Sequence, residues 1–187
     1  VTILMVGGIK LRGNPDFIMS EERSDTIKTF VIADTHFGHE NIIKYESRPF
    51  KNTEEMNQAL IKNWNSVVGE KDIVYFLGDF ALCSKEKIIE IGQQLKGYKI
   101  LIYGNHDKRS VGVFKRAGFD EVYKHPIEID NIIFSHAKIP YDNLKTNQIN
   151  IHGHIHSKCG AEPFGHTYKC VSVENINYTP IELSKII

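Results

Sequence analysis

The sequence lacks an excess of charge of either sign. Its 187 residues include 23 lysines and arginines and 23 aspartates and glutamates, so the formal net charge is zero. Proteins that hold long nucleic acids through the phosphates carry a general positive footprint. The balance therefore disfavours nucleic acid as a partner, although a local basic rim remains compatible with it.

Cysteines and long apolar runs are also scarce. Cys83, Cys159 and Cys170 are odd in number and have no C-x-x-C spacing, so neither a disulfide framework nor a zinc knuckle is indicated. We expect three structural thiols in a reducing, cytoplasmic compartment. No apolar stretch approaches the ~20 residues that a membrane-spanning helix needs, so no membrane association is expected.

Internal repeats, low-complexity tracts and linkers are absent as well, so nothing divides the chain. A length of 187 residues fits one domain with one substantial core. Residues 1–18 differ from the rest, because a short apolar run precedes the turn-forming segment Lys10–Pro15. We expect residues 1–18 to be an N-terminal extension without a catalytic role and residues 19–187 to form a single domain.

Short apolar runs alternate with helical patterns in the first part of the chain. Runs rich in aliphatic and aromatic residues predict buried strands at Thr29–Ala33, Asp72–Leu77 and Lys99–Tyr103. Capping residues and apolar spacing predict helices over Glu40–Glu46, after Asn52, after Ser84 and within Lys108–Ala117. A hairpin and a late strand follow, at Ile127–Ile129 with Ile132–Phe134 and at Cys170–Glu174. This order of elements indicates an α/β layered fold with mixed sheets.

Metal-binding side chains gather where the predicted strands end. They are Asp34, His36, Asp79, Asn105, His106, His136, His154 and His156. In an extended chain, side chains two residues apart point the same way, so Asp34 with His36, and His154 with His156, can each grip one centre. The set is large enough to fill two metal sites, and its mixed nitrogen and oxygen donors suit Mn, Fe, Zn or Ni better than Mg or Ca.

The order of these motifs resembles a known family. The series D-x-H, G-D, G-N-H-D, H and G-H-x-H, from Asp34 to His156, is similar to that of the calcineurin-like metallophosphoesterase superfamily. The segment Asp34–Phe50 looks like a small bacterial and phage branch of it. The resemblance implies two packed mixed β-sheets flanked by helices, a four-layer αββα sandwich, and a centre of two divalent metal ions, with Mn²⁺ expected to serve in vitro.

The resemblance also implies a role for each residue of the motifs. Asp34, His36 and His156 would hold one metal. Asn105, His136 and His154 would hold the other, and Asp79 would bridge both. His106 would face the substrate phosphate, and Asp107 would orient its ring.

The implied activity is hydrolysis of a phosphomonoester or phosphodiester of a small molecule or nucleotide. A metal-bridging hydroxide would attack phosphorus, and His106 would assist at the phosphate or the leaving group. Protein phosphatases and dinucleotide polyphosphatases extend the second motif as G-D-x-x-D-R-G, whereas Gly78-Asp79 continues here as Phe80–Ser84. Those substrates are therefore disfavoured. Two alternatives stay open, a nuclease acting on DNA or RNA and a binding scaffold that keeps the fold without catalysis.

Three further residues lie close to the motifs. His39 and Arg48 are candidates for binding a substrate phosphate, since Arg suits bidentate contact, but a helix cap or a surface ion pair explains them almost as well. His152 shares parity with His154, and we expect it to support or pack behind the ligands, because the ligand set is complete without it.

Overall fold

The computed structural model describes residues 5–6, 9–10, 26–159 and 165–187. Most of the expected extension, residues 1–18, and the expected domain start at residue 19 lie outside the described residues. Within that extension, β1 (Met5–Val6) pairs antiparallel with β2 (Ile9–Lys10). Across the described ranges, every helix is too short or too polar to cross a membrane.

A five-stranded sheet forms the centre of the fold, in the order β11-β3-β4-β5-β6. Its strands are β3 (Thr29–Ile32), β4 (Ile73–Phe76), β5 (Tyr98–Ile102), β6 (Glu121–Tyr123) and β11 (Ile181–Glu182). Strands β3 to β6 are parallel, and β11 is antiparallel at the edge. Ile32 pairs with Phe76, and Phe76 pairs with Leu101, so three strands end at one level of the sheet. The loops that follow these strands therefore meet at one edge.

A second sheet has four strands in the order β10-β9-β8-β7. They are β7 (Ile127–Ile129), β8 (Ile132–Phe134), β9 (Ile149–His152) and β10 (Tyr168–Cys170). Strands β8, β9 and β10 are parallel, and β7 forms the predicted hairpin with β8. A backbone bridge between Ala33 and Ser172 joins the ends of the two sheets. Both sheets are mixed, as the sequence predicts.

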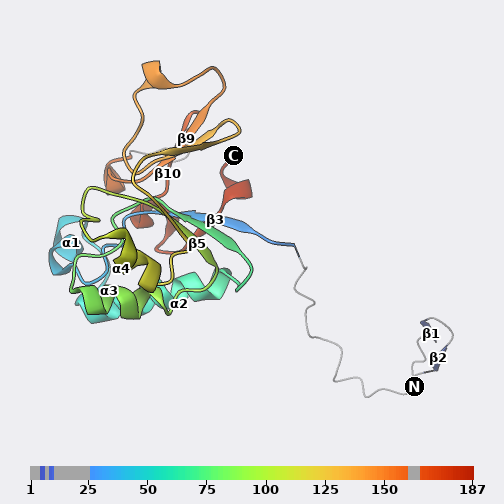
Figure 1. Cartoon of the computed structure of the whole chain (residues 1–187), viewed down its shortest axis with the longest axis horizontal. Helices are drawn as coiled ribbons and strands as arrows, with labels where there is room; N and C mark the ends of the chain where they lie inside the picture. Colours follow the sequence, from blue (N-terminus) through green and yellow to red (C-terminus); the bar gives the residue numbers. More distant parts are fainter. Residues whose placement is uncertain (1–4, 7–8, 11–25, 160–164) are drawn as a thin grey trace.

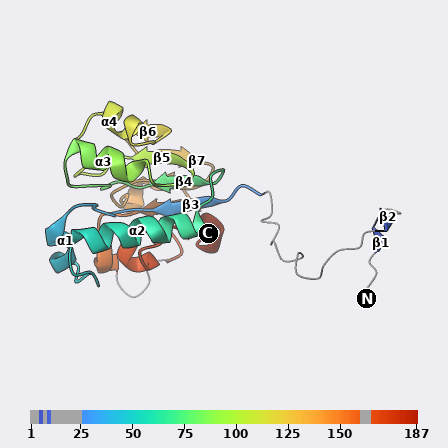
Figure 2. The same ribbon diagram turned by 90° about the horizontal axis from the view of Figure 1, so that it is seen from below.

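The α-helices cover one face of the larger sheet. They are α1 (Glu40–Tyr45), α2 (Thr53–Val67), α3 (Lys85–Gly92) and α4 (Val111–Arg116). Figure 1 shows α2, α3 and α4 on one side of β3 and β5, with β9 and β10 on the other, and Figure 2 views the molecule from the helical side. The side chains of Asn52 and Ser84 accept the backbone N–H groups of the third helical residues, which confirms the two predicted N-caps.

Two apolar cores hold the layers together. Phe30 and Ile32 of β3 pack against the helices, whereas Val31 and Ala33, which point to the other face, pack against the second sheet. A parallel strand that is buried on both faces reads as a continuous apolar run, which explains why β3 was predictable. The predicted fold, two packed mixed sheets flanked by helices, is confirmed.

The segment 137–148 contacts the smaller sheet at β9 and β10. This segment contains the short 3-10 helix η2 (Tyr141–Asn143), and the backbone N–H of Ile139 donates to Asn150 Oδ1 at 2.8 Å. The remaining 3-10 helices of the described residues are η3 (His156–Cys159), η4 (Val173–Ile176) and η5 (Leu183–Lys185). Among the described residues, the segment 137–148 thus contains one 3-10 turn and no α-helix.

The predicted late strand at Cys170–Glu174 is wrong. Strand β10 ends at Cys170, and η4 begins at Val173. Val171 packs between the sheets, whereas Val173 packs in the helical core. Residues two apart in one strand face the same side, so burial in two different cores requires the chain to leave the sheet between them.

Candidate metal centre

All of the predicted metal ligands come together at the edge where the parallel strands end. Three groups of side chains offer ligand atoms that lie within 4.8 Å of one another, and the third, Glu46, His156 and Glu174, shares His156 with the first. We call Asp34, His36 and His156 the first triad, and Asp79, His136 and His154 the second triad. Asn105 joins the second triad, because its Oδ1 lies 2.9 Å from His136 Nε2.

The backbone at these residues is left-handed rather than extended. The φ angles are positive at Asp34 (60°), His36 (49°), Asp79 (58°), His154 (71°) and His156 (49°). Residues other than glycine rarely adopt this backbone region, and such strain concentrates at functional sites. These segments are therefore not extended, as the prediction from strand parity assumed. His154 and His156 fall in different triads.

The first triad contains buried polar atoms that lack hydrogen bonds. Oδ2 of Asp34 accepts from the backbone N–H of His154 at 2.8 Å and from Ser172 Oγ at 2.6 Å. Oδ1 of Asp34 and both ring nitrogens of His36 are buried and have no hydrogen-bond partner in the structure. Burial raises the pKa of Asp34 to about 6 and lowers the pKa of His36 to about 3.

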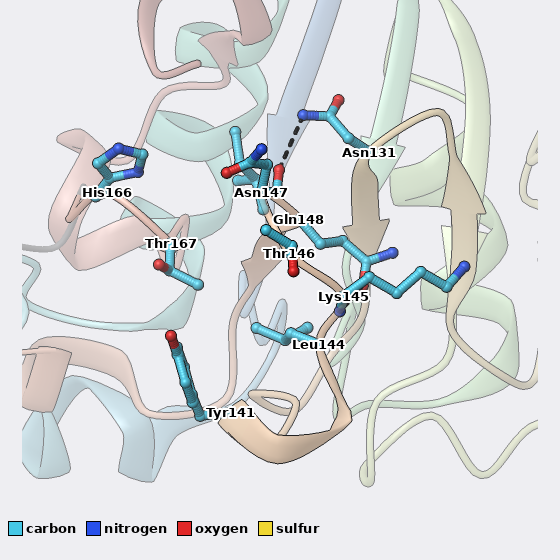
Figure 3. A pocket seen from close by; sticks show the side chains of 10 residues that line it. Asn131, Tyr141, Leu144, Lys145, Thr146, Asn147, Gln148, His166 and Thr167 are labelled. Carbon is cyan, nitrogen blue, oxygen red and sulfur yellow. Dashed lines mark hydrogen bonds between the residues drawn. The ribbon is translucent and has the colours of Figure 1, made fainter.

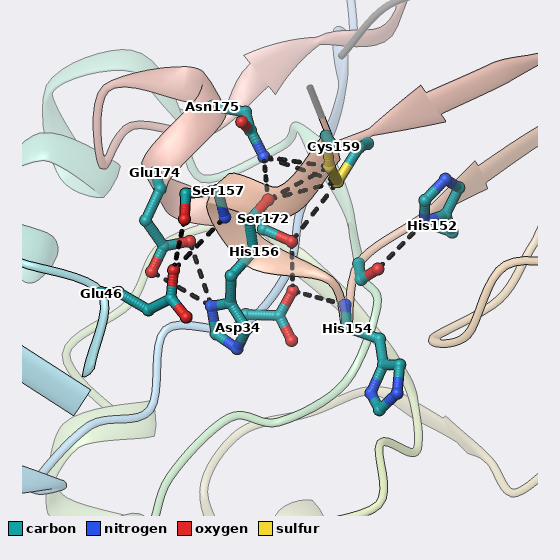
Figure 4. Close-up of a disulfide and its surroundings, with 12 residues drawn as sticks. Asp34, Glu46, His152, His154, His156, Ser157, Cys159, Ser172, Glu174 and Asn175 are labelled. Atoms are coloured by element: carbon teal, nitrogen blue, oxygen red, sulfur yellow. Dashed lines mark hydrogen bonds and ion pairs between the residues drawn. A yellow bond between two sulfur atoms is a disulfide. The ribbon is translucent and has the colours of Figure 1, made fainter. Parts of the chain in front are cut away.

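The third member of this triad, His156, is oriented by Glu174. The ring Nδ1 lies 3.1 Å from Glu174 Oε1, and the carboxylate is held in turn by Arg48, whose Nη2 donates at 2.6 Å. Figure 4 shows the imidazole of His156 between Glu174 and Asp34. With Nδ1 donating to a carboxylate, Nε2 has its lone pair free for a metal.

The second triad is satisfied by its own hydrogen bonds. His136 Nδ1 donates to the carbonyl of Leu77 at 2.8 Å, and its Nε2 lies 3.1 Å from His154 Nδ1 and 3.4 Å from Asp79 Oδ2. Burial opposes the charged form of His136, but the hydrogen bond to Asp79 and the nearby carboxylates raise its pKa to about 9. Burial likewise opposes ionisation of Asp79, yet His136 holds the pKa of that carboxyl at about 2. The two groups form a buried ion pair.

Asp79 lies between the triads. Its Oδ2 is 3.6 Å from His36 Nε2 in the first triad and 3.4 Å from His136 Nε2 in the second. Its other oxygen, Oδ1, accepts the backbone N–H of His106 at 2.8 Å. A Cβ on Gly104 would overlap the Asp79 carboxylate and backbone, so this glycine is needed for the close approach of two loops, and its φ is not in the left-handed range.

The resemblance implied that Asp107 orients the ring of His106, but the hydrogen bonds of the Asp107 carboxylate in the structure go to backbone groups. Its carboxylate accepts three backbone N–H groups, those of Asp79 at 2.7 Å, Phe80 at 3.0 Å and Gly104 at 2.8 Å. The carboxylate is buried and joins the loop after β4 to the turn after β5. The His106 ring is half-buried and lies 5.4 Å from the His36 ring, edge to face.

The contact of Arg48 with a substrate phosphate stays a prediction, and in the structure its guanidinium is bonded inside the protein. Only 4% of this residue is exposed. Besides Glu174, its guanidinium donates to the carbonyls of Asp34 at 2.7 Å and Thr35 at 2.8 Å. Arg48 therefore holds the backbone of the first triad, and its ion pair is buried rather than on the surface. His39 does lie at the site, with its ring 5.5 Å from that of His36 and a buried Nδ1 without a hydrogen bond.

A disulfide stands where the sequence indicated three free thiols. Cys159 and Cys170 are bonded, and Cys83 is free. The pair is 11 residues apart, a spacing that does not reveal the pairing in the sequence. Figure 4 shows the disulfide beside the backbone of His156, whose carbonyl also accepts from Asn175 Nδ2 at 2.9 Å. The cysteine content thus no longer argues for a reducing compartment.

Sequence reasoning missed Glu174 and Ser172, which hold His156 and Asp34. Glu174 is 18 residues from His156 and 126 from Arg48. The need of a metal-bound histidine for an outer carboxylate is a general rule, but it does not say which of many acidic residues supplies it. His152, by contrast, is buried, belongs to neither triad, and bonds the carbonyl of Gly153 at 2.9 Å.

The residues fit a pair of divalent transition metals. A buried carboxylate oxygen and two buried imidazole nitrogens without partners are costly unless a cation satisfies them. The imidazole nitrogens at both triads, together with carboxylate and amide oxygens, form the donor set that suits Mn, Fe, Zn or Ni.

Comparisons with known proteins agree with this geometry. The family model for calcineurin-like phosphoesterases matches residues 27–184. An uncharacterized protein of Methanocaldococcus jannaschii is 44% identical over 168 residues, which cover 86% of this chain and 89% of the relative. The gene 66 protein of Mycobacterium phage L5 is 38% identical over 82 residues, or 42% of this chain and 39% of that protein. The crystal structure of a protein of unknown function from Aquifex aeolicus superposes with a TM-score of 0.66 at 30% identity, covering 86% of this chain and 98% of that one.

Proposed function

The chain belongs to the calcineurin-like phosphoesterase family, and we propose that it is a two-metal hydrolase of a nucleotide or other small-molecule phosphate ester. Membership makes it a metal-dependent hydrolase of phosphoesters. The use of two ions, the residue roles and the substrate are the proposal. A cytoplasmic location stays a prediction from the sequence.

The position of Asp79 carries the two-ion proposal. Its Oδ2 faces His36 Nε2 at 3.6 Å and His136 Nε2 at 3.4 Å, and these two nitrogens belong to different triads. One carboxylate can serve two ions only from such a place. We assign one ion to the first triad, the other to the second triad with Asn105, and Asp79 to both.

The metals, when bound, would supply Lewis acidity that activates water and neutralises charge on the phosphoryl group. The chain supplies the positioning. Asn105 and His154 are exposed, so substrate can approach from their side, while Asp34 and His36 are buried behind them. We expect Mn²⁺ to serve in vitro, with Fe, Zn and Ni as the other ions that the donor set suits.

His106 is the proposed group that meets the phosphate. Its backbone is fixed to Asp79 Oδ1, and its half-buried ring lies beside His36 without belonging to either triad. The imidazole can therefore donate a hydrogen bond to the phosphoryl oxygen or a proton to the leaving oxygen. His39, next to His36, is a second proposed contact for the phosphate.

The variant His106→Asn tests this role. We expect it to keep its metals, because no triad includes His106, and to lose about 10²- to 10⁴-fold in kcat, the usual contribution of a general acid or base. Activity is measured on bis-p-nitrophenyl phosphate and p-nitrophenyl phosphate with the Mn²⁺-loaded full chain, and metal content by elemental analysis. His166→Asn, on an exposed histidine away from the triads, is the matched control.

These measurements, together with an assay on a labelled oligonucleotide, distinguish the proposed function from the two alternatives. An unchanged kcat in His106→Asn would refute the assigned role. A chain that binds fewer than about one ion after loading, with no hydrolysis of either ester, would favour the scaffold. Cleavage of a labelled oligonucleotide at low enzyme, lost at high salt, would favour the nuclease.

A further inference from the structure

A cationic depression opens beside the Gly104 turn. It measures about 720 Å³, and its wall includes Asn105 and three basic side chains, Lys108, Arg109 and Lys124. A smaller hollow of about 210 Å³ also has Lys108 and Arg109 in its wall and reaches His106. The basic side chains therefore lie directly beside the residue proposed to meet the phosphate and the proposed ligand Asn105.

The charge of this depression is uncompensated. Of the described residues that line it, Asp107 is the only acidic one; it is 4% exposed, and its carboxylate is occupied by three backbone N–H groups. Among the described residues, none of the three basic side chains forms an ion pair. Arg109 Nη2 donates a hydrogen bond to the carbonyl of Cys83 at 3.2 Å. Because the chain as a whole has zero net charge, this local excess is not a by-product of general basicity.

The backbone that carries these cations is fixed relative to the site. The Tyr103 hydroxyl donates to the carbonyl of Arg109 at 2.8 Å, and the N–H of Lys108 donates to the carbonyl of His106 at 2.8 Å. Lys124 follows β6, and the N–H of Tyr103 donates to the carbonyl of Tyr123 at 2.9 Å. The basic groups are thus anchored to the same turn that carries His106.

Another depression of similar size lacks these features. It measures about 680 Å³ and lies at the smaller sheet, between the residues around Lys145 and Thr167 (Figure 3). None of the triad residues lines it. Its basic residue Lys145 is neutralised by Glu128, with Nζ and Oε1 2.7 Å apart. Size alone therefore does not single out the cationic depression; charge and proximity to His106 do.

We propose that the cationic depression binds a second phosphate group of the substrate, so that the substrate class is a phosphate ester that carries a further phosphate. The inference rests on the proposed function, since it extends the same site. Lysine ammonium and arginine guanidinium groups are the side chains that bind phosphate oxygens most strongly. A substrate with a single phosphate would leave them unused.

Two esters that differ by one phosphate test the proposal. Thymidine 3′-(4-nitrophenyl phosphate) and its 5′-phosphorylated form share the bond that is cut and the leaving group, and both release 4-nitrophenolate. With the Mn²⁺-loaded full chain we expect kcat/KM to be about tenfold higher for the 5′-phosphorylated ester, the effect of one charge-assisted contact. The gain should lie in KM and should shrink as salt is raised.

The double variant Lys108→Ala, Lys124→Ala should bring the ratio of kcat/KM between the two esters close to one. Lys62→Ala with Lys185→Ala, at two exposed lysines that line neither hollow, is the matched control and should keep the full ratio. Thermal melting confirms that the variants fold. A ratio near one in the wild type, or a full ratio in the double variant, would overturn the second-phosphate site. No hydrolysis of either ester or of bis-p-nitrophenyl phosphate would instead remove the proposed function.

Discussion

The two triads use the same residue types but reach different states in the protein alone. The second triad is internally bonded, with His136 Nε2 near Asn105 Oδ1 at 2.9 Å and His154 Nδ1 at 3.1 Å. The first triad leaves Asp34 Oδ1 and both nitrogens of His36 without hydrogen bonds. In the metal-free protein, Asp79 therefore favours the charged form of His136 in the second triad, whereas the first triad keeps three buried polar atoms that form no hydrogen bond.

This difference predicts unequal metal binding. A cation at the first triad would bind buried atoms that form no hydrogen bonds, whereas a cation at the second would first have to displace the proton of His136. We expect the first triad to bind its ion more tightly near neutral pH.

The substitution with the largest expected effect removes Asp79, the residue that faces both triads. Asp79→Asn replaces a carboxylate that faces both His36 and His136 with a group of one oxygen and no charge. We expect it to weaken binding of both ions and to reduce kcat/KM by more than the roughly 10- to 100-fold that loss of an outer partner costs. Elemental analysis and bis-p-nitrophenyl phosphate hydrolysis measure the two effects. Loss of only one ion would show that Asp79 serves a single triad.

A smaller effect should fall on the first triad alone. Glu174→Gln keeps the size of the side chain but removes the charge that holds His156 Nδ1 and pairs with Arg48. We expect the affinity for the first ion to fall about 10- to 100-fold while the second ion is unaffected. Equilibrium dialysis with Mn²⁺ resolves the two steps. Glu128→Gln, at an exposed glutamate of β7, serves as the control, and a parallel loss at both steps in Glu174→Gln would contradict the division into triads.

The smallest expected effect is a difference between the two triads in how metal affinity depends on pH. The pKa of His136 is about 9, raised from its ordinary 6.5, so between those values the metal-free protein carries a proton that the second ion must displace. Affinity for that ion should rise by up to about tenfold per pH unit until about pH 9 and then level. In the first triad, His36, with a pKa of about 3, is neutral over this range, and Asp34, with a pKa of about 6, is ionised. Burial opposes the charged form of His156, but the hydrogen bond to Glu174 raises its pKa, so we expect a smaller rise of affinity with pH for the first ion.

The raised pKa of His136 also predicts how the stability of the metal-free protein depends on pH. A raised histidine pKa stabilises the metal-free protein fully below pH 6.5, and this contribution is lost as the pH rises through 9. The gap in Tm between the metal-loaded and metal-free protein should therefore widen from pH 6.5 to 9. Competition with a chelator at three pH values gives the two affinities, and equal slopes for both ions would refute the contrast.

Much of the fold was predictable because local signals and burial agree. β3, β4 and β5 are short apolar runs that pack on both faces, and Asn52 and Ser84 cap helices by the expected contacts. The late strand failed where local pattern and tertiary burial disagree, since Val171 and Val173 enter different cores. The short strands β6 and β11 carry no apolar run long enough to announce them.

The set of residues at the site was predictable, but the work that several of them do was not. The order of the motifs predicted all seven ligands, which lie at one edge of the sheet. Left-handed φ angles at five of them break the two-residue alternation of side chains on which the strand argument depends. The role of Arg48 depends on Glu174, which is 126 residues away. Asp107 lies next to His106 in sequence, but its oxygens face the backbone of the neighbouring loop. Contacts of this kind arise only from the assembled fold.

The bonds of Asp107 have a consequence for protein engineering. The turn Gly104–Asp107 keeps its shape because one carboxylate also binds the N–H groups of Asp79 and Phe80. A designer who transplanted this turn alone into another parallel sheet would leave that carboxylate buried without two of its three donors. The portable unit is therefore the pair of neighbouring strand ends, β4 with Asp79–Phe80 and β5 with Gly104–Asp107, moved together in their native register.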